Sequence, residues 1–198
     1  MKQETLTYTE NRWIKQKQFD GSETEVDIVF IFGDRDVFKQ EAHFHEIKEL
    51  YPHAHIVGCT SSGNVLGDTV SQEVMVATAV FFEHGKVAVS IEDFTTDNDL
   101  KEVGRKVVSG LDKEGLKHIF ILSDGLNMNG SSLAQGVNEA VDNTIPITGG
   151  LAGDGTDFGE TWVIGDAPAK QSRVVAIGFY GEAVSVTSGC FAGWDEFG

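Results

Sequence analysis

Short apolar runs that end in glycine or small polar residues dominate the pattern of the chain. Residues 26–34 and 117–125 are two such runs, rich in Val, Ile and Phe, and this composition predicts buried strands. Residues 55–63 and 146–154 are shorter runs that pass into glycine-containing loops. Residues 74–82 are nearly apolar throughout instead of alternating, so we expect both faces of the sheets to be covered.

The order of these runs repeats along the chain. In the first copy, strands are expected at 26–34, 55–63, 74–82 and 87–94, with a helical stretch between the first strand and the second. In the second copy, the corresponding strands are expected at 117–125, 146–154, 173–180 and 184–191. We therefore predict an α/β fold of layered, mixed β-sheets covered by helices, built from two pseudo-repeated β-α-β-β-β halves at 26–94 and 117–193. A chance likeness between two ordinary α/β units is the alternative.

Apolar residues at helical spacing support this reading. Leu100, Val103 and Val107 recur on one face of a helix predicted at 97–111, which connects the two copies. No linker rich in Pro, Gly or Ser separates the copies, so residues 26–198 are expected to form one domain. The first 25 residues have weak patterning, and we interpret 1–25 as an N-terminal extension in which residues 6–9 form at most an edge strand.

Composition narrows the classes of partner. The chain has 15 Lys and Arg against 31 Asp and Glu, a net charge of −16, which repels phosphate backbones and anionic lipid surfaces. We therefore expect neither nucleic acid nor membrane as a partner. Cys59 and Cys190 are too few for a disulfide framework and indicate a reducing compartment. No apolar signal segment opens the sequence, so a cytoplasmic location is expected.

The familiar catalytic and metal-binding motifs are missing from the sequence. It contains neither a phosphate loop of the type G-x-x-x-x-G-K-[ST] nor a G-x-S-x-G nucleophile turn. The pair His43-x-His45 lies on a predicted helix, where alternate residues face different directions. The pair His53-x-His55 lacks a third ligand at metal spacing. We therefore predict no metal site and no enzyme activity.

Three glycine-containing loops follow predicted strands, where ligands of α/β sheets tend to bind. These loops span residues 58–63, 123–130 and 149–157. In the middle loop, Asn129 or Ser131 can cap the following helix and leave backbone amides for an anion such as a carboxylate. Asp124 can hold an ammonium group, so the loops together suit a zwitterion such as an amino acid. In the alternative interpretation, Asp124, Asn127 and Asn129 only satisfy the backbone of a turn.

The sequence also resembles a known family. The segments IVGCTSSG (56–63), LSDGLNMNG (122–130) and ITGGLAGD (147–154), in this order, resemble the FIST N domain of F-box and intracellular signal transduction proteins. The resemblance runs from about residue 26 to residue 198. It implies a sensory input domain of bacterial signalling proteins that binds small ligands such as amino acids and acts on a signalling output module, such as a kinase or cyclase-type partner. Family members normally continue after a Gly-Trp element into a FIST C domain, so the resemblance implies an N-terminal half without that domain.

The combined interpretation is a ligand-sensing domain without catalysis. Ligand contacts are predicted from Ser123, Asp124, Asn127, Asn129, Gly58, Thr60, Gly149, Gly150 and Asp154. Replacing Asp124 with Ala is expected to abolish ligand binding and leave the fold intact.

Two further classes stay open at this point. Some family members are described as haem proteins that sense nitric oxide, which makes a haem-based nitric oxide sensor the alternative. However, Ala192 stands where many relatives carry His, so we predict no cofactor. The other class is an interaction scaffold, or a hydrolase that relies on Cys59 or Ser123. A symmetric homodimer is the expectation from base rates.

Overall fold

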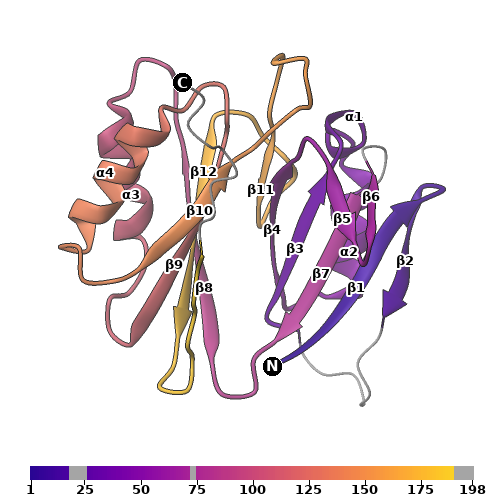
Figure 1. Ribbon diagram of the computed structural model, residues 1–198, viewed down its shortest axis with the longest axis horizontal. Helices are drawn as coiled ribbons and strands as arrows, with labels where there is room; N and C mark the ends of the chain where they lie inside the picture. The colour runs from indigo at the N-terminus through magenta and orange to yellow at the C-terminus, as the bar shows by residue number, and fades with distance from the viewer. Residues whose placement is uncertain (18–25, 72–74, 190–198) are drawn as a thin grey trace, which may run out of the picture.

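The computed structural model contains two β-sheets that face each other (Figure 1). It describes residues 1–17, 26–71 and 75–189. The larger sheet has the strand order β11-β4-β3-β7-β1-β2. Its strands are β1 (Lys2–Thr9), β2 (Arg12–Lys17), β3 (Ile28–Gly33), β4 (His55–Thr60), β7 (Met75–Phe81) and β11 (Val163–Gly165). Strand β3 runs parallel to β4 and antiparallel to β7, and β7 pairs antiparallel with β1.

The smaller sheet has the strand order β10-β9-β12-β8. Its strands are β8 (Lys86–Asp93), β9 (Leu116–Ser123), β10 (Ile147–Leu151) and β12 (Arg173–Tyr180). Strand β9 runs parallel to β10 and antiparallel to β12, which pairs antiparallel with β8. A short hairpin of β5 (Asn64–Leu66) and β6 (Thr69–Ser71) forms a two-stranded sheet of its own, and β5 contacts β7 of the larger sheet.

Helices cover the outer face of each sheet. They are α1 (Arg35–Phe38), α2 (Ala42–Leu50), α3 (Leu100–Ser109) and α4 (Gly130–Ala140). Ile47 of α2 packs with Val29 of the larger sheet, and Val107 and Leu133 of α3 and α4 pack with Ile119 of the smaller one (Figure 1). The prediction of layered, mixed β-sheets covered by helices is therefore confirmed. Among the described residues, no helix is long and apolar enough to cross a membrane.

The N-terminal residues enter the larger sheet more deeply than their pattern predicts. Strand β1 lies between β7 and β2, so the expectation of at most an edge strand at 6–9 is wrong. The pattern is weak because β1 contains a buried carboxylate, Glu4, among its apolar residues. Tyr51 donates a hydrogen bond to Glu4 over 2.5 Å, and Lys15 donates another over 3.1 Å. The domain boundary placed at residue 26 stays a prediction.

The closing strand of the predicted second copy also needs correction. Residues 184–189 form no strand, and the rest of the strand expected at 184–191 lies outside the described residues. The place beside β12 is taken by β8, which pairs with it from Asp93 to Lys86. Strand β8 thus belongs to the smaller sheet although it follows β7 of the larger one. The orders β4-β3-β7-β1 and β10-β9-β12-β8 are alike, but the duplication itself stays a prediction.

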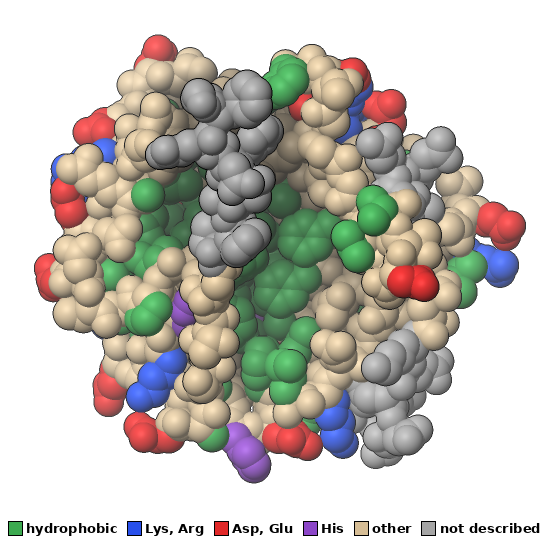
Figure 2. Space-filling view, in the orientation of Figure 1, with side chains coloured by type: hydrophobic (Ala, Val, Ile, Leu, Met, Phe, Trp, Pro, Cys, Tyr) green, Lys and Arg blue, Asp and Glu red, His purple; other side chains and the backbone are tan. Residues whose placement is uncertain are grey.

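The inner faces of the two sheets enclose a shared apolar cluster. Phe30 and Phe120 meet edge to face with ring centroids 6.0 Å apart, and Phe82 and Phe179 do so at 5.9 Å. These four rings are only partly buried. The space-filling view shows hydrophobic side chains inside a hollow between the sheets (Figure 2). Apolar surface that stays open in this way often marks a binding site.

Candidate functional site

A cavity of about 350 Å³, which we call the inter-sheet cavity, lies at the carboxyl ends of β3, β4 and β9 beside strand β10. Aromatic and aliphatic side chains form its walls, and serine, threonine and glycine residues provide its polar groups. The lining residues are Phe32, Cys59, Thr60, Ser61, Ser62, Phe120, Leu122, Gly149, Gly150, Leu151 and Gly153. None of them carries a formal charge at neutral pH, so the cavity favours the apolar part of a ligand.

A second hollow of about 360 Å³, the helix-side groove, lies between α4 and β10. Leu133, Ala134 and Val137 of the helix and Ile121 of β9 contribute to its lining. Residues 149–151 line both hollows. Strand β10 is therefore the wall that separates the helix-side groove from the inter-sheet cavity.

Three of the predicted contact residues, Thr60, Gly149 and Gly150, lie together at the inter-sheet cavity. The backbone N–H of Trp162 donates to Oγ1 of Thr60 over 3.1 Å, which fixes the end of β4 against the approach to β11. A Cβ atom added at Gly150 would meet no atom of the described residues within 4 Å. Gly58 lies outside this lining, within β4, where its added Cβ would stand 1.9 Å from the carbonyl oxygen of Ile31.

Asp124 is fully buried directly after β9, and its carboxylate joins three segments of the chain. Its Oδ1 accepts hydrogen bonds from the backbone N–H groups of Leu126 and Asn127, at 2.8 and 2.9 Å, and from the hydroxyl of Thr161 at 3.0 Å. Its Oδ2 accepts from Nδ2 of Asn127 at 3.1 Å and from the N–H of Ser172 at 2.7 Å. These bonds occupy the lone pairs that an ammonium group would need.

The pKa of Asp124 is lowered: burial alone would raise it, but the hydrogen bonds from Asn127, Ser172 and Leu126 outweigh burial. Two other predicted contact residues are engaged nearby. Ser123 is buried and donates to the carbonyl of Asp124, and Asn129 is the N-cap of α4, where it accepts from the N–H of Ser132 over 3.0 Å. These polar side chains form hydrogen bonds with backbone groups, and their contact with a ligand stays a prediction.

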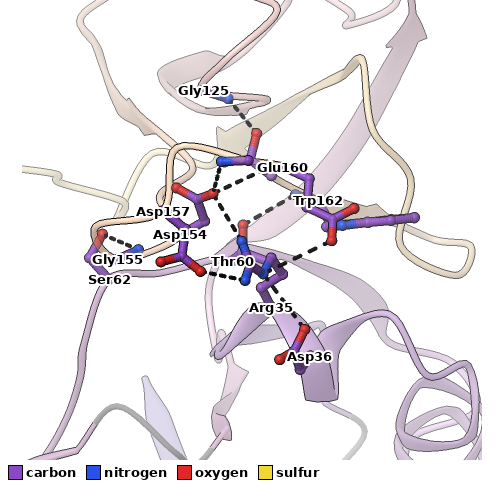
Figure 3. A network of polar contacts seen from close by, with 12 residues as sticks. Arg35, Asp36, Thr60, Ser62, Gly125, Asp154, Gly155, Asp157, Glu160 and Trp162 are labelled. Carbon is purple, nitrogen blue, oxygen red and sulfur yellow. Dashed lines mark hydrogen bonds and ion pairs between the residues drawn. The ribbon is translucent and has the colours of Figure 1, made fainter.

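Asp154 holds the loop that follows β10. Its Oδ2 accepts from the backbone N–H groups of Gly159 and Glu160 at 2.6 and 3.0 Å and pairs with Nη1 of Arg35 at 3.4 Å. Nη2 of Arg35 donates to Asp157 over 2.6 Å, so the guanidinium lies among the carboxylates of this loop (Figure 3). Burial would raise the pKa of Asp154, but the amides of Glu160 and Gly159, together with Arg35, lower it overall. Arg35 therefore ties the loop to the end of β3.

Replacing Arg35 with Gln should loosen this loop. Without the guanidinium, the carboxylates of Asp154, Asp157 and Glu160 repel one another, so the amides of Gly159 and Glu160 should exchange hydrogen several-fold faster than in the wild type. Hydrogen exchange followed by mass spectrometry checks this.

The matched control for Arg35 is Arg12→Gln, which removes an exposed arginine from the β1–β2 hairpin. This variant should leave exchange at 154–160 unchanged. Equal exchange in the wild type and in Arg35→Gln would contradict the role assigned to Arg35.

Sequence reasoning missed Arg35, because its partner Asp154 lies 119 residues further along the chain. It included Ser61, Ser62 and Gly153 only as parts of loops. The single signal for Arg35 was its place two residues after a strand that ends in glycine.

Cys59 lines the cavity, but burial raises the pKa of its thiol to about 12. The thiol is therefore protonated near neutral pH and is a poor nucleophile. Ser123, the other residue considered for hydrolysis, is fully buried and donates to a backbone carbonyl.

The sequence was also compared with models of known protein families. A family model for the FIST N domain matches residues 27–198, which include every residue that lines the two hollows. The chain belongs to the FIST N domain family. FIST domains form a family of sensory domains in signal transduction and not a catalytic family. A comparison of this FIST N domain with curated proteins gives no match.

The residues around the hollows of this FIST N domain do not fit a haem. Among the described residues, neither hollow is lined by histidine, methionine or tyrosine, and the thiol of Cys59, whose pKa is raised by burial, is a poor haem ligand. The buried imidazole of His118 stands beside Thr148, with Nε2 2.8 Å from its Oγ1, and burial lowers its pKa. His118 lines neither hollow, and Ala192 lies outside the described residues. We therefore derive no haem chemistry from this site.

Proposed function

We propose that this FIST N domain is the ligand-sensing input domain of a bacterial signal-transduction protein and that it binds an amino-acid-like molecule in the inter-sheet cavity. One observation carries the proposal. The cavity brings residues of two loops that the sequence singled out, 58–63 and 149–157, to the same opening between the sheets. Each segment begins within the last residues of a parallel strand, β4 in the larger sheet and β10 in the smaller one, so one ligand can contact both sheets.

The lining supports a ligand with an apolar side chain. The rings of Phe32 and Phe120 and the side chain of Leu122 offer an apolar surface, and a volume of about 350 Å³ is within the range of small-molecule sites. The hydroxyl groups of Ser61 and Ser62 and the backbone beside the glycines offer hydrogen bonds to polar ends of the ligand. Asp124 is enclosed by its own hydrogen bonds, so we assign ligand contact to the cavity lining instead.

Signalling follows from a difference in affinity between two arrangements of the domain. A ligand that contacts both sheets binds more tightly to the arrangement in which both sheets contact it best. Binding therefore shifts the population toward that arrangement. An attached or partner output module then responds to the shift. This mechanism requires no bond to be made or broken by the FIST N domain.

Filling the cavity should abolish ligand binding without unfolding the protein. Gly150 pairs with Leu122, so a side chain at this position points into the space between the sheets, where no atom lies within 4 Å of an added Cβ. A thermal-shift panel of apolar amino acids and small carboxylates should include one that raises the melting temperature of the wild type. A ligand at one hundred times its Kd stabilises by about 2.7 kcal/mol, or roughly 5–10 °C at this size. Gly150→Val should lose this shift.

The matched control is Gly189→Ala, because an added Cβ also meets no atom within 4 Å at that glycine and Gly189 does not line the cavity. This variant should keep the shift of the wild type. If Gly150→Val keeps the shift as well, the ligand binds elsewhere. If no compound shifts the wild type, the assignment of an amino-acid-like ligand is wrong.

A further inference from the structure

Within the described residues, strand β10 has an open edge. It pairs with β9 on one side and ends the strand order of the smaller sheet on the other. The N–H of Ile119 donates to the carbonyl of Pro146, and the N–H of Ala152 donates to the carbonyl of Ser123. Because the backbone groups of a parallel strand alternate in direction, the groups of residues 147, 149 and 151 point to the open side.

Proteins usually protect such edges with charged side chains, proline or a covering element. Strand β10 carries no charged residue and no proline within Ile147–Leu151, and residues 149–151 are exposed. Among the described residues, no backbone group pairs with this side of β10, so the edge presents donors and acceptors that are a template for another strand.

The two hollows lie on opposite faces of this edge. Ile147 of β10 packs with the helices, whereas Gly150 faces the space between the sheets. A strand added beside β10 would direct alternate side chains to these two faces, one set toward the helix-side groove and the other toward the inter-sheet cavity. Peptide recognition by strand addition has this form: the backbone gives affinity, and pockets for alternate side chains give specificity.

The lining of the groove indicates what the added strand carries. None of the described residues that line the helix-side groove is charged, and its volume of about 360 Å³ suits branched or aromatic side chains. The chain as a whole has a net charge of −16, so basic residues that flank the strand are favoured.

A second copy of this chain is a poor occupant for the same groove. Its own β10 has glycine at positions 149 and 150 and would leave both hollows empty. Two copies would also bring together two chains that each carry a net charge of −16.

We propose that the open edge of β10 binds an extended segment of a partner protein, with apolar side chains that enter the helix-side groove and basic residues at its ends. This interaction does not require the amino-acid-like ligand. Residues 149–151 form one wall of each hollow. A ligand in the inter-sheet cavity therefore changes the same segment of β10 to which the partner strand binds. Coupling of this kind is reciprocal: the partner strand changes ligand affinity by the same factor.

Capped nine-residue peptides test the proposal on the full chain. Each has lysine at both ends and alternates threonine with valine, leucine or phenylalanine, and binding is followed by fluorescence anisotropy. At least one peptide should bind saturably, and N-methylation of alternate amides should weaken it at least tenfold by removing the ladder hydrogen bonds. Ala134→Arg, which places a charged side chain in the groove, should have the same effect.

The control for Ala134→Arg is Gln135→Arg, which adds the same charge to an exposed neighbour on α4 that does not line the groove. This variant should bind as the wild type does. Three results would overturn the proposal: no peptide binds, binding survives both N-methylation and Ala134→Arg, or sedimentation shows a dimer that Ala134→Arg dissociates. Ala134 does not line the inter-sheet cavity, so the thermal shift by a small ligand should persist in Ala134→Arg, which separates the two proposals.

Discussion

Replacing Asp124 with Ala is expected to destabilise the fold by roughly 4 kcal/mol or more, among the largest effects of a single substitution. This expectation from the structure replaces the one from the sequence, which was that the variant keeps its fold. The carboxylate is fully buried, and its loss leaves the backbone N–H groups of Leu126, Asn127 and Ser172 and the hydroxyl of Thr161 without an acceptor. Each unsatisfied buried group costs about 1–3 kcal/mol. Unfolding in urea, read by fluorescence and circular dichroism, gives the free energy of unfolding.

Asp97→Ala is the matched control, because Asp97 is exposed, and its effect should stay within about 0.5 kcal/mol. The lowered pKa of Asp124 adds a test by pH. Its contribution is present above the ordinary carboxyl pKa of about 4 and is lost as the pH falls through the lower folded-state value. The difference in free energy of unfolding between the wild type and Asp124→Ala should therefore become smaller as the pH is lowered. A variant that is as stable as the wild type but loses the ligand-induced thermal shift would instead support Asp124 as a ligand contact.

Gly58→Ala is expected to cost about 3 kcal/mol or more, at the upper end of what overpacking usually costs. An alanine Cβ at this position would lie 1.9 Å from the carbonyl oxygen of Ile31 and 2.8 Å from its carbon. These are backbone atoms of β3 that pair in register with β4, so neither strand can move without breaking the parallel pair. Thermal unfolding should show a melting temperature lower by roughly 6–12 °C.

Gly150→Ala provides the comparison for Gly58. It lies at the end of the other parallel pair, where the added Cβ meets no atom within 4 Å, so the melting temperature should change little. Equal effects of the two substitutions would show that the close approach of β3 and β4 does not limit the residue at 58.

Local patterns predicted much of the architecture. The runs that became β3, β4, β7, β9 and β12 are apolar because both faces of these strands are buried, and the sequence records that burial directly. The same holds for α3, whose buried Val103 and Val107 lie at helical spacing. Residue type and position also limited the N-cap of α4 to Asn129 or Ser131, and the structure has Asn129 there.

Pairing between distant segments was not predictable in this way. Strand β8 looks like the natural hairpin partner of β7, yet it pairs with β12, and no local signal distinguishes the two arrangements. The sequence did not predict that β1 lies inside the larger sheet, because Tyr51, the hydrogen-bond partner of the buried Glu4, is remote in sequence.

The candidate site shows the same division between local and distant information. The loops 58–63 and 149–157 were found from glycine and strand ends, and they meet at the cavity. The role predicted for Asp124 rested on residue type alone. Whether a carboxylate faces a ligand or its own backbone depends on residues such as Thr161 and Ser172, which are 37 and 48 positions away.

The exchange of strands between the two halves has a consequence for synthesis of the chain. Strand β8 leaves the ribosome soon after β7, but β12, which is its neighbour among the described strands, begins only at Arg173. In the same way, the larger sheet lacks its edge strand beside β4 until residues 163–165, which form β11, have been made. A nascent chain therefore carries residues 86–93 without their partner strand β12 until residues 173–180 have been made. Neither sheet is complete until the second half has emerged, so the first half cannot finish folding before the second half is made.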